Sequence, residues 1–381
     1  MSSPSYHYVF AGTGAAALSL LLRLQDAHLL QGKRVLLLDR SRKTDNDRTW
    51  CFWEKGEGYF EKIIHKRWEK LAFLTEGESR ELAMGAYVYK MIRGIDFYEY
   101  CLKRLQGLPN LEWQYGELEW KDGDNNTRQL YCEGQPVDCT GALVFNSLAP
   151  APQITADNLA LLQHFKGWIL ETERTVFDAG KGLLMDFRVP QTAGTTFVYV
   201  LPLSASKALV EFTVFSKQLL SAEAYEAGLK SYWAQHFGNE PYRIVEEEFG
   251  IIPMTAQPYP QPVDGIIQIG TAGGQTKAST GYTFQFIQKK SAQIVAALHQ
   301  GRPVPALLKA PWRFQFYDRV LLQLLVEGRL PGKEIFTRLF HRNPAHQIFQ
   351  FLDNETSLPA ELSLISRLQF WPFLRAAWRT L

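Results

Sequence analysis

The fold is decided by the stretch Tyr6-His-Tyr-Val-Phe-Ala-Gly-Thr-Gly-Ala-Ala-Ala17, by the leucine-rich segment after it, and by Arg34-Val-Leu-Leu-Leu-Asp39. The pattern predicts a short strand, a glycine turn, a helix, and a second strand that ends on a carboxylate. Gly12 allows the tight turn out of the first strand, and Gly14 lets a pyrophosphate approach the backbone without meeting a side chain. The complete unit is therefore typical of a dinucleotide site.

The same unit indicates which residues would hold the cofactor. Amide groups at the start of the helix carry partial positive charge toward the phosphates, and Asp39 can accept hydrogen bonds from a ribose hydroxyl. A place near the beginning of the chain is typical of two-domain flavoproteins, so FAD is favoured over NAD. The alternative is a glycine turn between a strand and a helix that binds nothing. The predicted cofactor-binding residues of this unit are Gly12, Thr13, Gly14, Ala15, Ala16 and Asp39.

Composition argues against several classes of partner. The chain of 381 residues has 41 Lys and Arg against 39 Asp and Glu, and it has no basic run suited to nucleic acid, so no nucleic-acid partner is expected. The 10 Trp, 16 Tyr and 24 Phe suit a large apolar ligand or a membrane-facing surface. The sequence shows neither a cleavable signal peptide nor a run of about 18 apolar residues, so no membrane-spanning helix is expected.

The cysteines indicate the compartment. They form no Cys-x-x-Cys pair, and no histidine cluster lies near them in the sequence. We therefore expect buried, small hydrophobic residues in a reducing compartment, which predicts a cytoplasmic protein without a metal site. The four residues are Cys51, Cys101, Cys132 and Cys139.

The order of the predicted elements indicates an α/β fold, in which a Rossmann-type FAD-binding domain carries an inserted β-rich substrate domain and is followed by a helical C-terminal region. Strand patterns return in Gly265-Ile-Ile-Gln-Ile-Gly270, and a helix near 284–298 follows, so a second strand–glycine–helix element would complete the cofactor cradle. A loop around Pro150 and Pro152 suggests a boundary. The predicted division is a discontinuous FAD-binding domain over 1–60, 91–150 and 246–300, a β-rich substrate domain over 61–90 and 151–245, and a helical region over 301–381.

Six stretches in order carry a resemblance to a known family. They are Asn46-Asp-Arg-Thr-Trp-Cys-Phe-Trp53, Tyr87-Val-Tyr-Lys-Met-Ile-Arg-Gly-Ile-Asp-Phe97, Met185-Asp-Phe-Arg188, Val198-Tyr-Val-Leu-Pro202, Gly270-Thr-Ala-Gly-Gly274 with Ser279-Thr-Gly-Tyr-Thr-Phe284, and Phe316-Tyr-Asp318. Together they resemble the flavin-dependent lycopene β-cyclases of the bacterial carotenoid type over most of the chain.

The resemblance implies an isomerase that cyclises the linear ends of lycopene or a related carotenoid to β-rings, giving γ-carotene and β-carotene without net redox change. It implies reduced FAD, with NAD(P)H needed only as the reductant, and a protein that contacts the membrane peripherally and associates with other carotenoid enzymes. It adds Arg48, Gly270, Gly273, Gly281 and Tyr282 to the predicted cofactor-binding residues. Arg48 could instead pair with a carboxylate, and the segment at Tyr282 could simply begin a helix.

Cyclisation begins with protonation of a carbon–carbon double bond, which needs an acid that stays protonated in an apolar site. Glu211 lies in the alternating strand Ala208-Leu-Val-Glu-Phe-Thr-Val-Phe215, on one face with Leu209, Thr213 and Phe215. Alternation does not say which face is inside, so a solvent-facing glutamate on an edge strand is the alternative. The resemblance selects Glu211 as the catalytic acid or base.

One departure from the family concerns a second acid. Many of its members read Phe-Leu-Glu-Glu-Thr where this chain reads Leu209-Val-Glu-Phe-Thr213, so the second glutamate is replaced by Phe212. A mechanism that uses two carboxylates at these adjacent positions is therefore in doubt. Asp186 could be a partner carboxylate or a structural acid at a turn, and the run Glu246-Glu-Glu248 is predicted to be a solvated face.

Three isolated histidines, His65, His164 and His341, are predicted to be structural. The tail Leu364–Leu381 alternates apolar residues at helical spacing with Arg367, Arg375 and Arg379, and Pro372 is expected to kink it or start a turn. Such a segment suits a helix that lies in a membrane interface, and the alternative is a terminal helix packed on the protein.

Two other functions share the fold and cofactor signals: a redox FAD enzyme, such as a hydroxylase or reductase of a large apolar substrate, and a non-catalytic lipid-binding relative.

Overall fold

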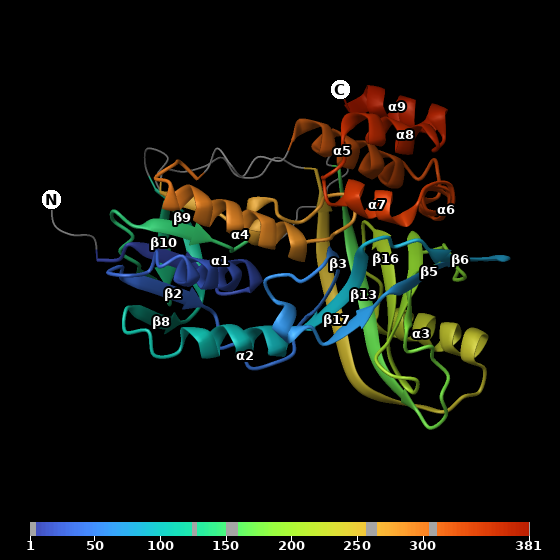
Figure 1. Ribbon diagram of the computed structural model, residues 1–381, viewed down its shortest axis with the longest axis horizontal. Coiled ribbons are helices and arrows are strands. Elements are labelled where there is room, and N and C mark those ends of the chain that lie inside the picture. Colours follow the sequence, from blue (N-terminus) through green and yellow to red (C-terminus); the bar gives the residue numbers. More distant parts are fainter. Residues whose placement is uncertain (1–4, 124–127, 150–158, 257–264, 305–310, 381) are drawn as a thin grey trace.

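The computed structural model describes residues 5–123, 128–149, 159–256, 265–304 and 311–380, and it has two large sheets side by side with helices around them (Figure 1). The predicted loop at Pro150 and Pro152 lies outside the described residues. The described termini of the chain lie far apart, and the C-terminal helices cover one end of the second sheet (Figure 1).

The first sheet is parallel and contains the opening unit of the sequence. Its strand order is β18-β12-β1-β2-β8, and all its pairs are parallel. Parallel strands buried on both faces are continuously apolar, which explains the leucine run of the second strand. Because β1 lies between β2 and β12, it marks the switch point where ligands bind at the carboxyl ends of the strands. The strands are β1 (Tyr8–Ala11), β2 (Val35–Asp39), β8 (Leu111–Tyr115), β12 (Leu143–Asn146) and β18 (Ile266–Gln268).

Two layers cover this parallel sheet. On one face, Phe10, Leu37 and Phe145 pack in one core cluster with the apolar stripes of α1 (Ala15–Asp26), α2 (Gly94–Leu105) and α4 (Phe284–His299). On the other face, Val9, Leu36 and Val144 pack against a small antiparallel sheet. That sheet consists of β9 (Leu118–Asp122), β10 (Arg128–Cys132) and β11 (Gln135–Pro136).

The second large sheet has seven strands in the order β17-β13-β16-β15-β14-β5-β6. Helix α3 (Ala222–Phe237) packs against one of its faces through Tyr225, Leu229 and Trp233. Strand β17 stays in register with β13 to Thr255, so this sheet extends beyond residue 245, where the predicted β-rich domain ended. The strands are β5 (Lys70–Thr75), β6 (Glu78–Leu82), β13 (Ala160–Thr172), β14 (Lys181–Asp186), β15 (Thr195–Pro202), β16 (Lys207–Ser216) and β17 (Tyr242–Thr255).

A small antiparallel sheet connects the two halves of the molecule. Its strands are β3 (Thr49–Lys55), β7 (Tyr87–Arg93) and β4 (Lys66–Trp68), in the order β3-β7-β4. Phe52 and Ile92 belong to the core around α1, whereas Trp53 and Tyr89 belong to the core of the seven-stranded sheet. Alternate side chains of the same strands therefore fix the two halves against each other.

The C-terminal region is helical, as the sequence predicts. Side chains Phe336, Phe340 and Phe349 of α6 and α7 pack onto the seven-stranded sheet, on the face opposite α3. The helices are α5 (Trp312–Glu327), α6 (Gly332–Arg342), α7 (Ala345–Leu352), α8 (Leu358–Ser366) and α9 (Phe370–Thr380). The predicted fold class is confirmed, while the predicted domain boundaries remain a prediction.

Candidate active site and cofactor cradle

The two glycines of the opening unit have different surroundings. Gly12 has φ +87°, and a Cβ built on it would overlap the hydroxyl of Ser147, which donates a hydrogen bond of 3.1 Å to the carbonyl of Ala11. A Cβ at Gly14 would meet no atom within 4 Å. The fold itself therefore requires a glycine at position 12, because no side chain fits there. Gly14 instead leaves open space beside the backbone, as a phosphate-binding turn requires.

Helix α1 begins directly at this open space. Gly14 is its N-cap, no side chain caps the helix, and its first turn contains no acidic residue. The first amide groups of a helix have no partner inside the helix, and they attract anions. The open space at Gly14 and the uncapped start of α1 therefore support the fit of a pyrophosphate, in addition to the glycine spacing of the sequence.

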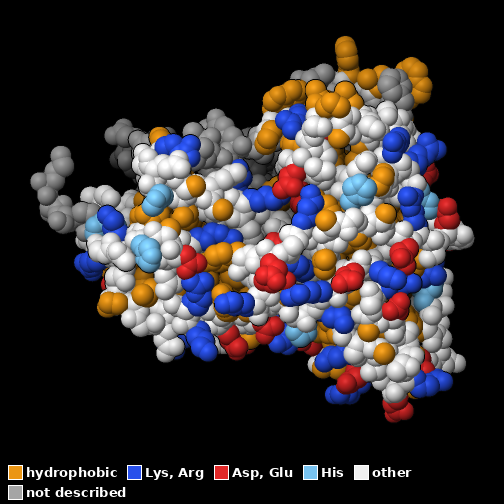
Figure 2. Space-filling view, in the orientation of Figure 1, with side chains coloured by type: hydrophobic (Ala, Val, Ile, Leu, Met, Phe, Trp, Pro, Cys, Tyr) orange, Lys and Arg blue, Asp and Glu red, His pale blue; other side chains and the backbone are white. Residues whose placement is uncertain are grey.

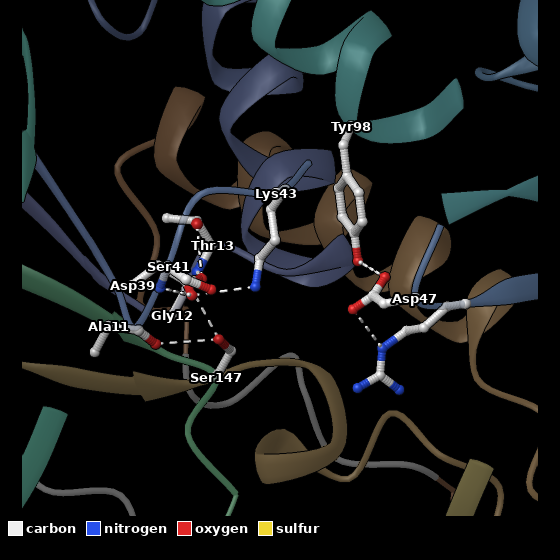
Figure 3. Close-up of polar contacts among 10 residues, drawn as sticks. Ala11, Gly12, Thr13, Asp39, Ser41, Lys43, Asp47, Tyr98 and Ser147 are labelled. Atoms are coloured by element: carbon white, nitrogen blue, oxygen red, sulfur yellow. Dashed lines mark hydrogen bonds and ion pairs between the residues drawn. The ribbon is translucent and has the colours of Figure 1, made fainter. Parts of the chain in front are cut away.

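Asp39 lies at the carboxyl end of β2 and is tied to the glycine turn (Figure 3). Its Oδ2 accepts hydrogen bonds from the amide of Thr13 at 2.7 Å and from the Thr13 hydroxyl at 2.8 Å, and its Oδ1 lies 3.1 Å from Nζ of Lys43. Burial raises the pKa of Asp39, but the bonds from Thr13 and the charge of Lys43 outweigh it, so the pKa lies below its usual value. Asp39 is thus an ionised acceptor, the state that a ribose hydroxyl needs.

The returning glycine segment closes the cradle from the other side. It forms the short 3-10 helix η3 (Gly270–Gly273), and a Cβ at Gly270 would lie 3.1 Å from the Cβ of Ala16. A Cβ at Gly273 would overlap the carbonyl oxygen of Gln268. The absence of a side chain at Gly270 lets η3 pack closely against the start of α1, and the absence of one at Gly273 lets η3 turn back onto the end of β18, so six predicted residues of the first unit and these two glycines come together.

The remaining three predicted cofactor residues lie elsewhere. Arg48 is exposed, and its guanidinium pairs at 3.7 Å with Asp47, which accepts a hydrogen bond of 3.0 Å from Tyr98 of α2; Figure 3 shows Asp47 and Tyr98 beside the Asp39 group. A Cβ at Gly281 would overlap the side-chain oxygen of Gln163 on β13. Gly281 therefore lies where the cradle meets the seven-stranded sheet.

Tyr282 extends this junction. Its ring packs edge-on against Trp53 of β3 with the ring centroids 4.3 Å apart, and its hydroxyl shares hydrogen bonds with Tyr89 and Tyr199. The loop before it is anchored by Asp318 of α5, whose Oδ1 lies 2.8 Å from Nζ of Lys277. Tyr282 thus lies with the side chains around Glu211, and apart from the phosphate end of the cradle.

Glu211 faces the interior of the molecule. Its strand β16 lies between β13 and β15, so the alternative of a solvent-facing edge strand is wrong. Leu209 and Phe215, on the same face, belong to the buried core under α6 and α7. The hydroxyl of Thr213 donates a hydrogen bond of 2.8 Å to Oε1 of Glu211, which orients the carboxyl group.

A second carboxyl group comes from β17, which is the next strand along the chain but is not a neighbour of β16 in the sheet. Gly167 of β13 is in register with Glu211 on one side and with Glu248 of β17 on the other, so all three share one face. A Cβ at Gly167 would lie 2.9 Å from Cγ and 3.0 Å from Oε1 of Glu248, so the side chain of Glu248 lies over the glycine. The hydroxyl of Thr49 donates a hydrogen bond of 2.6 Å to Oε2 of Glu248. The prediction that Glu248 lies on a solvated face is wrong.

The environment favours the protonated form of both acids. Burial raises the pKa of Glu211 well above its usual value, and the neighbouring charge of Glu248 raises it further. Burial also raises the pKa of Glu248. Because like charges in a poorly solvated site oppose double ionisation, the environment favours the state of the pair that holds one proton. Both residues are half-buried.

Aromatic hydroxyls and a thiol surround these acids. Tyr199 is in register with Glu211 on β15, and Tyr89 and Tyr282 share its hydroxyl cluster. Burial raises the pKa of all three tyrosines and of the Cys51 thiol, so all four groups are neutral at physiological pH. They surround the acids with neutral, weakly polar groups, and aromatic rings of this kind attract a cation.

Two other candidates, Asp186 and His164, have partners within the protein that fit the structural roles the sequence allows. Asp186 is fully buried on the opposite face, where it pairs with Arg188 at 2.6 Å and accepts a hydrogen bond of 2.6 Å from Tyr232 of α3. His164 is held between the hydroxyls of Tyr225 and Ser216 at 2.6 and 2.8 Å. Within the described residues, no group of three or more His, Cys, Asp or Glu side chains is placed to hold a metal ion.

Sequence reasoning missed three residues of this site, Thr49, Gly167 and Glu248. A single glycine inside a strand pattern signals close approach of another group, and Gly167 carries that signal. Alternation also separates Glu248 from Glu247, which lies 2.8 Å from Nζ of Lys166. No pattern in the sequence reveals that β16 and β17 flank the same strand, and that pairing brings the carboxyl groups together.

Comparisons with known proteins agree with this architecture. The model of the lycopene cyclase protein family matches residues 8–378. The chain is 23% identical to a lycopene β-cyclase of Pantoea ananas, covering 98% of this chain and 97% of that protein. It is 24% identical to a lycopene β-cyclase of Paracoccus sp. (strain N81106 / MBIC 01143), covering 95% of this chain and 94% of that protein.

Solved structures share the fold at low sequence identity. A geranylgeranyl bacteriochlorophyll reductase-like protein of Thermoplasma acidophilum aligns with a TM-score of 0.61 and 12% identity over 99% of both chains. A single-substitution variant of HpxO from Klebsiella pneumoniae, solved with FAD, aligns with a TM-score of 0.56 and 12% identity, over 95% of this chain and 99% of that chain. The family match spans nearly the whole chain, and the chain therefore belongs to the lycopene cyclase family of enzymes.

Proposed function

We propose that this protein is a lycopene β-cyclase, which converts the linear ends of lycopene or a related carotenoid to β-rings without net redox change. The observation that carries the proposal is Glu211, an acid that retains its proton on the inward face of a central strand, among apolar and aromatic side chains. An acid of this kind can protonate a carbon–carbon double bond, whereas an ionised surface glutamate cannot. Membership of the family supplies the substrate class.

The side chains around Glu211 have distinct tasks in this reaction. Thr213 holds one carboxyl oxygen of Glu211 and leaves the other oxygen to carry the proton. Tyr89, Tyr199 and Tyr282 are neutral, and in this proposal their electron-rich rings stabilise the tertiary cation formed by protonation. Attack by the neighbouring double bond closes the ring, and loss of a ring proton completes the product.

The cofactor of this proposal is FAD in its reduced form, with NAD(P)H as the reductant. Gly12, Thr13, Gly14, Ala15, Ala16 and Asp39 would hold its phosphates and ribose, together with Gly270 and Gly273, while Gly281 and Tyr282 would line the path toward Glu211. The open space at Gly14 and the uncapped start of α1 support this role. Arg48, which pairs with Asp47, would serve at the rim of the cradle. When bound, the reduced flavin supplies an electron-rich ring that stabilises positive charge.

The proposal includes a peripheral contact with a membrane, because lycopene dissolves in lipid and not in water. None of the described helices is long and apolar enough to cross a bilayer. Helix α9 buries Ala376 against α5, and Trp371, Leu374 and Trp378 on its outer face are 75%, 47% and 80% exposed. Arg375 lies on the same outer face. Figure 2 shows hydrophobic side chains gathered at this end of the molecule.

Apolar and cationic side chains on one exposed helix face are typical of interfacial helices. Pro372 lies in the first turn of α9, so it begins a helix and does not kink one. Replacing Trp371 and Trp378 together by Gln is expected to reduce binding to vesicles of neutral and anionic phospholipid about tenfold or more, since two apolar anchors are lost. The control is Leu219→Gln, a residue that is 45% exposed elsewhere. An equal loss in the control would contradict this surface assignment.

The function is tested by expression in cells that accumulate lycopene. Pigment extracts should shift from lycopene to γ-carotene and β-carotene, and Glu211→Gln should leave lycopene unconverted. Glu247→Gln, on the outer face of β17, is the matched control and should convert normally. Consumption of NAD(P)H in step with product would indicate the redox alternative. A purified protein that retains no flavin and converts nothing would indicate a lipid-binding relative.

A further inference from the structure

We propose that Glu211 and Glu248 act as one proton-sharing pair, which delivers the proton that begins the cyclisation and takes back the proton that ends it. The pair assigns a catalytic role to Glu248, which lies 37 positions further along the chain, and it rests on the cyclase function proposed above. It also supplies the second acid that the sequence lacks at position 212.

The pairing is built into the sheet. Glu211 on β16 and Glu248 on β17 do not lie on neighbouring strands, because β13 runs between them. The residue of β13 in register with both is Gly167, and any larger residue there would separate the two side chains. The Cγ and Oε1 atoms of Glu248 occupy the space that a Cβ at Gly167 would need. Each carboxyl group has the other among its hydrogen-bond partners.

Two threonine hydroxyls each bind one carboxyl oxygen of the pair and leave the other oxygen available for the shared proton. Thr213 donates to Oε1 of Glu211, and Thr49 donates to Oε2 of Glu248. The other oxygen of Glu248, Oε1, lies over Gly167, the residue of β13 that is in register with Glu211. A threonine hydroxyl thus holds one oxygen of each carboxyl group, and the second oxygen is left for the shared proton.

The surrounding charges oppose double ionisation. The groups that act on Glu211 are Glu248 and the Thr213 hydroxyl, and those that act on Glu248 are Thr49, Glu211 and the negative charge of Glu246. The other titratable groups facing the pair are neutral: Cys51 on β3, Tyr89 on β7, Tyr199 on β15, and Tyr282 before α4. No cation of the described residues is among these groups, so one proton remains on the pair at neutral pH.

An acid at position 212 could not replace this arrangement. Phe212 neighbours Glu211 on the strand, so its side chain points to the opposite face, where it packs with Val198 and Tyr225 in the core under α3. A glutamate there would point away from Glu211. The sheet therefore takes its second carboxyl group from β17, on the correct face.

The pair donates one proton and accepts one proton for each ring that is formed. The O–H bond of Glu211 breaks, a C–H bond forms at the terminal double bond, and the electron pair left on the carboxylate makes the pair doubly negative. That charge stabilises the tertiary cation until the neighbouring double bond closes the ring. The doubly negative pair is then a strong base for its site, and it removes the ring proton as the new double bond forms. No oxidant or reductant is consumed.

The test compares Glu248→Gln with Glu247→Gln, using the purified flavin-loaded enzyme and lycopene in mixed phospholipid micelles. Glu248→Gln should lower kcat about 10²-fold at neutral pH, which is typical of losing a general base, while KM stays within about threefold. Removing the Glu248 charge lowers the pKa of Glu211, so the alkaline limb of the pH–rate profile should move toward acid by about one unit or more. Glu247→Gln should change neither quantity. An unchanged alkaline limb in Glu248→Gln would overturn the shared-proton pair.

A readout that does not need turnover separates this inference from the proposed function. Infrared difference spectra of the wild-type protein should show a protonated carboxyl band at neutral pH, which disappears in Glu211→Gln and titrates at lower pH in Glu248→Gln. If the band behaves in this way and lycopene is not converted, the pair stands and the cyclase function fails. If lycopene is converted and the wild-type band is absent, the cyclase function stands and the pair fails. If Glu248→Gln does not fold, Thr49→Val is tested in its place.

Discussion

Replacement of Gly167 by Ala is the smallest change that tests the geometry of the site. The new Cβ would lie 2.9 Å from Cγ of Glu248 and 3.0 Å from Cδ1 of Leu209, and ordinary carbon contacts lie at about 3.5–4.0 Å. Glu248 must therefore move by about 0.5–1 Å, away from the space over the glycine. No main-chain strain accompanies the change, because Gly167 is not among the residues with positive φ.

The expected magnitudes follow from these distances. Crowding of this kind destabilises a core by about 1–3 kcal/mol, and replacing glycine recovers about 0.4–1 kcal/mol by restricting the unfolded chain. The free energy of unfolding should fall by about 0–2.5 kcal/mol, which leaves the protein folded. A displacement approaching 1 Å costs about 10²-fold in rate when it separates reacting groups, so kcat should fall about 10-fold to 10²-fold.

The matched control is Gly182→Ala in β14 of the same sheet. A Cβ there would lie 3.0 Å from Leu71 and 3.2 Å from Leu201, so the crowding is similar but involves no carboxyl group. Urea unfolding gives the stability of both variants, and conversion of lycopene by the purified enzymes gives kcat. We expect a comparable loss of stability in both variants and a loss of turnover only in Gly167→Ala. Equal turnover in the two variants would refute the reasoning about the carboxyl pair.

Further predictions concern the cradle and the pH dependence of stability. Gly14→Ala should keep its free energy of unfolding within about 1 kcal/mol, since its Cβ meets no atom within 4 Å, yet the purified protein should lose its flavin absorbance. Gly12→Ala should lose both stability and bound flavin, because the φ of Gly12 is positive and a Cβ there would overlap Ser147. A stable Gly12→Ala protein that keeps its flavin would contradict the assignment of this turn to the cofactor site. Burial and the charge of Glu248 raise the pKa of Glu211, so the stability that Glu211 contributes is fully present below about pH 4.3 and is lost as pH rises through its folded pKa. Glu211→Gln should therefore flatten the decline of Tm as the pH rises above about 4.3, and parallel curves for the two proteins would show that the acid is not perturbed.

The cradle could be predicted from sequence because its parts are local. The strand, the turn at Gly12 and Gly14, the helix and Asp39 are consecutive, and their chemistry depends on spacing within about thirty residues. The second glycine element at Gly270 could be recognised for the same reason. Burial of Glu211 could not be derived from alternation, since the order of strands decides which face is covered.

Glu248 shows where sequence reasoning stops. Three consecutive glutamates resemble a solvated face, and two of them do contact polar partners: Glu247 pairs with Lys166, and Glu246 accepts a hydrogen bond from Asn46. The third, Glu248, lies over Gly167 instead, because β17 pairs with β13 in a register that places Glu248 opposite this glycine. That juxtaposition depends on long-range register, which no local pattern contains.

The central claim is that Glu211 protonates the substrate and that no net reduction follows. Its most direct test is mass analysis of the product that the purified enzyme forms from lycopene in D2O. The account predicts a product isomeric with lycopene except for one deuterium for each ring formed, with no NAD(P)H consumed per ring and no product from Glu211→Gln. A product that gains two hydrogens, or a Glu211→Gln enzyme that still incorporates deuterium at the normal rate, would contradict it.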